Sequence, residues 1–157
     1  MVTQASLLQH IHNAKKAHLH WVKRARHLVE GLPINKDFIP LEATSCRFGK
    51  WFYTEGMYLK NIESTRKLIQ EIEIEHDKLH ESYKNIYKIF FIIPKQKSLL
   101  RKIFLFNYHS ISKNEQEKAK IYFKYLKRTS EELVDTLTRL EGKIKHLSHH
   151  ELKKLSH

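Results

Sequence analysis

Apolar residues recur at alternating steps of four and three along three long stretches of this chain, which is the spacing of one face of an α-helix. These stretches cover about residues 4–30, 57–93 and 113–147. Only 4 glycines and 3 prolines occur in 157 residues, so the chain has few places at which it can turn sharply. The pattern predicts an all-α protein, namely an antiparallel four-helix bundle with one or two additional short helices.

Residues that end or begin helices separate these stretches. Gly31 and Pro33 follow the first stretch in the order that helix ends prefer. Pro94 ends the second stretch, because proline lacks the amide hydrogen that an interior helix position needs. Ser112 and Glu115 form a capping-box pattern before the third.

Two shorter segments complete the predicted helices. A short helix is expected at about residues 45–54, after a loop over residues 32–44. The apolar and basic piece at residues 98–107 is expected to form a short extra helix, which caps the core rather than covering a partner surface.

Two histidines occupy stripe positions at which a bundle normally places leucine. His18 lies in the middle of the first stripe, whereas its neighbours His10, His12, His20 and His27 fall off it and are expected to be solvated. His76 lies on the stripe of the second stretch. A buried imidazole without a partner costs about 1–3 kcal/mol, and a metal ion would satisfy both rings.

A third histidine, His80, lies one helical turn beyond His76. Two imidazoles at positions i and i+4 project from one helix face and can chelate one ion. This signal is weak by itself, because the chain has 12 histidines and His146 and His150 form a second such pair.

Cys46 is the only cysteine, so an internal disulfide is excluded. It begins the short helix, and Gly49 three residues later would let a neighbouring helix or its imidazole approach closely. A lone cysteine is by default a small buried hydrophobic residue. As a thiolate beside three imidazoles, it would instead complete a closed tetrahedral shell that selects zinc.

Three blocks of residues together resemble the chemoreceptor zinc-binding (CZB) domain. They are His18-Leu-His-Trp21, Cys46-Arg-Phe-Gly49-Lys-Trp51 and His76-Asp-Lys-Leu-His80, in the order of the family's His-x-x-Trp, Cys-x-x-Gly-x-Trp and His-x-x-x-His motifs. The resemblance extends over about residues 5–147. It implies one zinc ion per chain, with ligands His18, Cys46, His76 and His80, and with Trp21 and Trp51 packed beside the site.

The resemblance also implies a function. Members of this family are bacterial and cytoplasmic, often homodimeric, and usually fused to chemoreceptors or diguanylate cyclases. They sense zinc, or oxidants such as hypochlorous acid, through the zinc-bound cysteine, which is Cys46 here. We therefore expect a non-enzymatic sensory domain over residues 1–157, with a ligand core at 5–90 and a closing helix at about 113–147, that signals to a chemotaxis or cyclic-di-GMP partner.

Three other interpretations compete with this one. A helical adaptor with a purely structural zinc ion stays open. A di-iron carrier that resembles hemerythrin needs inward carboxylates, but Glu73, Glu75 and Asp77 lie off the stripe of His76. Hydrolytic zinc catalysis needs an open coordination position for water, and four protein ligands leave none.

The charge of the chain adds a further class of partner. Lys and Arg number 29 against 17 acidic residues, a net charge of +12, which can attract nucleic acid or an anionic membrane. The basic residues are spread along every predicted helix without aromatic-plus-basic motifs, which argues against nucleic acid. The most apolar run, residues 86–93, is too short to span a bilayer, and the first residues lack a signal-peptide pattern, so we expect a cytoplasmic protein.

Overall fold

A computed structural model describes residues 2–32, 34–35, 39–93 and 111–155. Within these ranges the regular structure is entirely helical, which confirms the all-α class. The α-helices are α1 (Gln4–Val29), α2 (Arg47–Phe52), α3 (Glu63–Tyr87), α5 (Lys113–Ile144) and α6 (His149–Lys153), joined by the 3₁₀ turns η2 (Ala43–Ser45) and η3 (Gly56–Asn61) and the π turn η4 (Lys88–Ile92). The expected helix at 98–107 lies outside the described residues.

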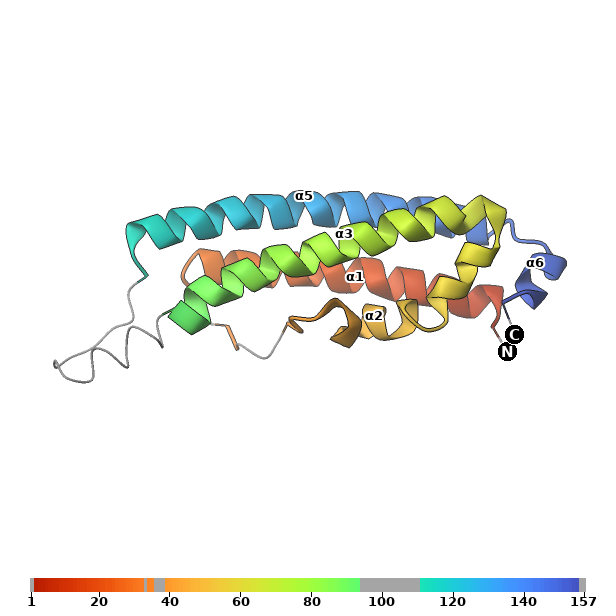
Figure 1. Cartoon of the computed structure of the whole chain (residues 1–157), viewed down its shortest axis with the longest axis horizontal. Coiled ribbons are helices and arrows are strands. Elements are labelled where there is room, and N and C mark those ends of the chain that lie inside the picture. Colours follow the sequence, from red (N-terminus) through yellow and green to blue (C-terminus); the bar gives the residue numbers. More distant parts are fainter. Residues whose placement is uncertain (1, 33, 36–38, 94–110, 156–157) are drawn as a thin grey trace.

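Three long helices lie side by side (Figure 1). α1 and α3 run in the same direction, and α5 runs in the opposite direction and packs against both. The chain from η2 to η3 runs alongside, antiparallel to α1 and α3. Its only α-helix, α2, has six residues, so a short broken segment takes the place of a long fourth helix.

The ends of α1 and α5 follow from local capping. Ser112 accepts a hydrogen bond from the backbone N–H of Glu115 in the predicted capping box of α5. At the C-terminal end of α1, Gly31 has a φ of 84°. The N–H of Gly31 donates to the carbonyl of Leu28, and the N–H of Leu32 donates to that of His27. This Schellman motif explains why glycine follows the helix.

The predicted stripe of α1 is the buried face of the helix. Alternating steps of four and three from Leu7 give seven positions, and all seven are buried: Leu7, Ile11, Ala14, His18, Trp21, Ala25 and Leu28. The histidine therefore does occupy a core position, between Ala14 and Trp21.

The helix predicted over residues 57–93 is wrong at its start, and its last turn differs in form although it reaches the predicted end. The backbone at Ile62 is extended, and the hydroxyl of Thr65 donates to the carbonyls of Leu59 and Ile62, so α3 begins only at Glu63. At the other end the π turn η4 adds a residue to the helical turn. Ile89, three residues after the buried Ile86, is buried at the end of this face, and Phe90 is half-buried.

No helix among the described residues is long and apolar enough to cross a membrane.

Candidate metal centre

The four predicted ligands come from three separate elements. His18 lies on α1, Cys46 is the N-cap of α2, and His76 and His80 lie on α3. All four are buried, with exposed fractions of 2%, 8%, 0% and 1% respectively. Residues as far apart in the sequence as His18 and His80, which are separated by 62 positions, therefore meet in one enclosed place.

The donor atoms of these side chains converge. One ligand atom each from His18, Cys46 and His76 lies within 4.8 Å of the others. The Sγ atom of Cys46 is 3.3 Å from Nε2 of His76. His80 is not part of that compact group of three, but its Nε2 lies 3.1 Å from Nε2 of His76. The structure thus brings all four predicted residues together, with His76 at the centre.

Backbone carbonyls orient two of the three imidazoles. Nδ1 of His18 lies 2.8 Å from the carbonyl oxygen of Ala14, and Nδ1 of His80 lies 3.1 Å from that of Leu41. Since a carbonyl can only accept, each Nδ1 carries the proton and each neutral ring has its lone pair on Nε2. A hydrogen bond from the ring nitrogen that does not bind the metal is the usual support of a metal-bound histidine.

Those two carbonyls were missed in the sequence. The contact with the Ala14 oxygen could have been predicted, because Ala14 lies four residues before His18 on the same helix and its carbonyl is within reach of the ring. The Leu41 oxygen had none, because the loop before α2 has no pattern that places it over α3.

Cys46 is the N-cap of α2, so the backbone N–H groups of the first helical turn point towards its side chain. The N–H of Gly49 donates to its Sγ over 3.1 Å. A Cβ atom on Gly49 would lie 1.8 Å from the carbonyl oxygen of Ala43. The predicted close approach at Gly49 is therefore real, but the approaching group is the backbone of the preceding turn, and not a neighbouring helix or an imidazole.

Burial sets the protonation of the cluster. Desolvation lowers the pKa of His18 to about 4, that of His76 to about 2 and that of His80 to about 4. The three rings are neutral at pH 7, which is the form that binds metal. Burial raises the pKa of the Cys46 thiol, and the N–H groups of Gly49 and Phe48 oppose this shift. A nearby cation would favour the thiolate.

Aromatic side chains enclose the cluster. The ring centroid of Trp21 lies 4.4 Å from that of His80 and 5.9 Å from that of His18. Phe48, which sequence reasoning did not single out although it stands in the Cys-Arg-Phe-Gly block, lies 5.5 Å from His18 and 5.0 Å from His76. Trp21 therefore packs beside the site as expected.

Trp51 lies one layer further out. Its ring packs on Phe48 at 5.8 Å and stacks on His10 at 4.7 Å, with an angle of 7° between the planes of Trp51 and His10. The expectation that His10 is solvated is wrong, because this half-buried ring covers the indole.

The donor set fits a zinc ion. Among the described residues, the converging group of His18, Cys46 and His76 offers imidazole nitrogens and a sulfur and no carboxylate. Such donors suit zinc better than magnesium, calcium or manganese. The buried Nδ1 of His76 has no hydrogen-bond partner among the described residues. Glu75, the nearest half-buried acid in sequence, accepts a hydrogen bond from Thr136 on α5 instead. The di-iron interpretation gains no support from this arrangement.

A buried cluster of three histidines and one cysteine on packed helices makes a candidate metal site in a helical domain. Residues 18–87 match the model of the chemoreceptor zinc-binding domain family, a segment that contains all four residues. The resemblance drawn from the three sequence blocks to the chemoreceptor zinc-binding domain is therefore confirmed over this segment. No curated protein and no solved structure matches the chain.

Proposed function

We propose that this chain binds one zinc ion through His18, Cys46, His76 and His80 and acts as a sensory or regulatory module without catalytic activity. The observation that carries the proposal is the convergence of a thiol and three neutral imidazoles, from three elements, inside the segment that matches a zinc-binding sensory family. Four protein donors leave no open position for a reacting water, which argues against hydrolytic chemistry.

Cys46 is the residue through which we propose that the module responds. A bound zinc ion would hold its sulfur as the thiolate, the nucleophilic and oxidisable form. Hypochlorous acid oxidises such a thiolate to a sulfenic acid by transferring its oxygen to sulfur, and is itself reduced to chloride. Cys46 then no longer binds as a thiolate, and one of four ligands is weakened.

The position of Cys46 suggests which part of the fold would respond. It caps α2, which has only six residues and packs on α1. The three histidines belong to helices of 26 and 25 residues that pack on α5. The short segment from η2 to η3 would therefore move first when the Cys46 ligand is lost. In this proposal that segment is the fourth member of an antiparallel four-helix bundle.

The biological setting is part of the same proposal. Domains of this family are linked to chemoreceptor signalling. We propose that this chain is a bacterial, cytoplasmic homodimer that signals to a chemotaxis or cyclic-di-GMP partner, with either zinc or an oxidant as the stimulus.

The test is zinc content and zinc release under graded hypochlorous acid. The wild type should hold one zinc per chain and release it as oxidant is added. Cys46→Asp keeps an anionic ligand without an oxidisable sulfur, so the zinc that this variant binds should stay bound over the same range of hypochlorous acid. Cys46→Ala controls for loss of the ligand. Equal oxidant-driven release from the wild type and both variants would show that Cys46 is not the redox switch. Iron at two per chain would overturn the zinc site.

A structural zinc ion in a helical adaptor is the second candidate, and the complete burial of the cluster favours it. The zinc dissociation constant separates the two functions. A value within the range of buffered cellular zinc, with altered helix packing on removal, supports sensing. Irreversible unfolding on chelation supports the adaptor.

A further inference from the structure

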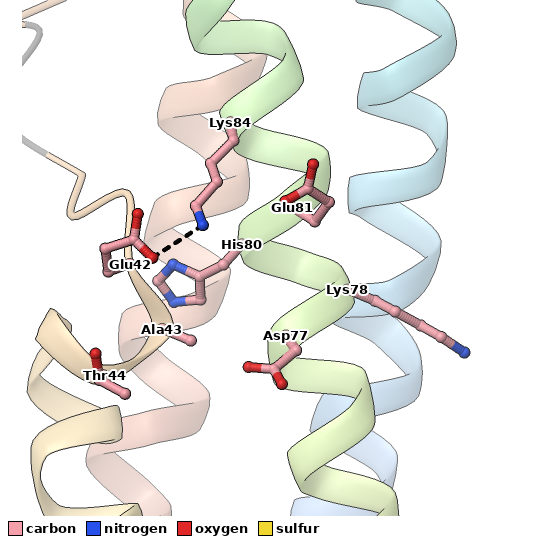
Figure 2. Close-up of a pocket in the computed structure, with 8 residues that line it drawn as sticks. All are labelled: Glu42, Ala43, Thr44, Asp77, Lys78, His80, Glu81 and Lys84. Carbon is pink, nitrogen blue, oxygen red and sulfur yellow. Dashed lines mark hydrogen bonds and ion pairs between the residues drawn. The ribbon is translucent and has the colours of Figure 1, made fainter.

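A pocket of about 440 Å³ opens on the surface beside His80. It lies between α3 and the turn that precedes α2, as Figure 2 shows. Its lining residues are Glu42, Ala43 and Thr44 from the turn, and Asp77, Lys78, His80, Glu81 and Lys84 from α3.

The floor of this pocket belongs to the metal centre. His80 lines the pocket although only 1% of the residue is exposed. Its Nε2 lies 3.1 Å from Nε2 of His76, which in turn lies 3.3 Å from the sulfur of Cys46. One imidazole ring therefore separates the pocket from the remaining ligands. Elsewhere Trp21 and Phe48 pack against the ligand rings.

The charges at the pocket matter because the chain as a whole carries +12. Such a net charge opposes the approach of a divalent cation, so a local excess of carboxylates is needed where the ion arrives. Lys84 is neutralised by an ion pair with Glu42 over 2.9 Å, and Lys78 points away from the pocket in Figure 2.

Asp77 is the carboxylate best placed to receive a cation. It has no ion-pair partner among the described residues, and Figure 2 shows it beside the His80 ring and facing the turn. The hydroxyl of Tyr53 donates to its Oδ1 over 2.8 Å and so fixes the carboxylate, while no donor to Oδ2 is found in the part of the chain that the structure describes.

We propose that zinc enters and leaves through this pocket. Asp77 is the carboxylate that first holds the ion and passes it to His80 and His76 by ligand exchange. The Glu42–Lys84 ion pair ties the turn to α3 and forms the outer rim of the opening. This inference rests on the zinc site of the proposed function.

The experiment measures rates as well as affinity. Zinc uptake by the metal-free chain is followed by stopped flow, and release by transfer to a chromophoric chelator. Asp77→Asn should slow uptake about tenfold at low salt, with a smaller effect at high salt, because attraction by an exposed carboxylate is screened. Ala43→Phe fills the pocket and should slow uptake and release by the same factor, so the dissociation constant stays unchanged. Asp135→Asn removes an exposed carboxylate of α5 outside the pocket and should change neither rate.

The outcomes separate the two proposals. A wild-type chain that binds no zinc overturns the proposed function. Zinc bound at one per chain, with wild-type rates in both Asp77→Asn and Ala43→Phe, overturns the route and leaves the function intact. If Ala43→Phe does not fold by circular dichroism, Thr44→Phe, at an exposed position of the same lining, decides the question: slowed uptake and release support the route, and unchanged rates overturn it.

Discussion

Nε2 of His76 lies 3.1 Å from Nε2 of His80, and both rings are buried. The proton of neutral His80 is on Nδ1, because this atom donates to the carbonyl of Leu41. If the proton of His76 is on Nδ1, two lone pairs face each other and a buried N–H has no acceptor. If it is on Nε2, the buried Nδ1 lone pair has no donor. A cation bound by both Nε2 atoms removes the repulsion between their lone pairs, so zinc should stabilise the fold.

The first prediction concerns that stabilisation. Zinc at 100 times its dissociation constant should raise the free energy of unfolding by about 2.7 kcal/mol, since it binds the folded chain. His80→Ala should weaken zinc binding by more than about 100-fold, because loss of even a supporting partner costs 10–100-fold. Chelator competition and urea unfolding measure both effects. His20→Ala, at an exposed position of α1, should behave as the wild type does. Unaltered affinity in His80→Ala would remove His80 from the ligand set.

The second prediction compares two glycines. Gly49→Ala places a Cβ 1.8 Å from the carbonyl oxygen of Ala43, so the turn must shift. We expect a loss of about 1–3 kcal/mol, as in other overpacked sites, together with weaker zinc binding, because Cys46 caps the same turn.

Gly142→Ala is the matched control within α5. Its Cβ would meet no atom within 4 Å, and alanine is the better helix former. This variant should be up to about 1 kcal/mol more stable in urea unfolding, with unchanged zinc affinity. If the two variants have the same stability, the close contact at Gly49 is not a constraint on the fold.

Much of this arrangement follows from sequence spacing. The stripe of α1 is buried at every expected position, because a regular helix repeats its inward face without outside information. His18 and His76 could be singled out for the same reason. The last helix was harder, because its core face includes Thr129, Ser130 and Thr136, which do not read as apolar.

The interruptions could not be predicted from spacing. The break at Ile62 depends on the hydroxyl of Thr65, which donates to the carbonyls of Leu59 and Ile62. The π turn over Lys88–Ile92 leaves no signal in the apolar spacing. The pairing of Leu41 with His80 depends on how a loop of irregular backbone crosses α3. For Cys46, the family resemblance supplied what periodicity did not.

The third prediction uses the two tryptophans as reporters. Trp21 lies 4.4 Å from the ring of His80, whereas Trp51 stacks on His10. Zinc binding changes the charge beside Trp21 and should change the indole emission in a saturable way with a stoichiometry of one. Trp51→Phe should keep this signal and Trp21→Phe should lose it. A signal that follows Trp51 would place the ion elsewhere.

The fourth prediction concerns the tie between α1 and α5. Glu141 accepts hydrogen bonds from Lys145 over 2.8 Å and from Lys15 of α1 over 2.5 Å, and these two partners lower its pKa to about 2. Because the folded pKa lies below the ordinary value of 4.5, the charged pairs stabilise the fold fully above pH 4.5. Their contribution is lost as the pH falls from 4.5 towards 2.

Glu141→Gln should therefore lower the free energy of unfolding of the metal-free chain at pH 7. The loss should be about 1 kcal/mol or less, since the side chain is 25% exposed and water and salt weaken the pairs. Urea unfolding at pH 7 and at pH 3 measures it, and the gap between variant and wild type should narrow at pH 3. Glu117→Gln is the control, because its partner Lys120 lies on the same helix and no second helix is held. A gap that widens at pH 3 would contradict a charge-based tie.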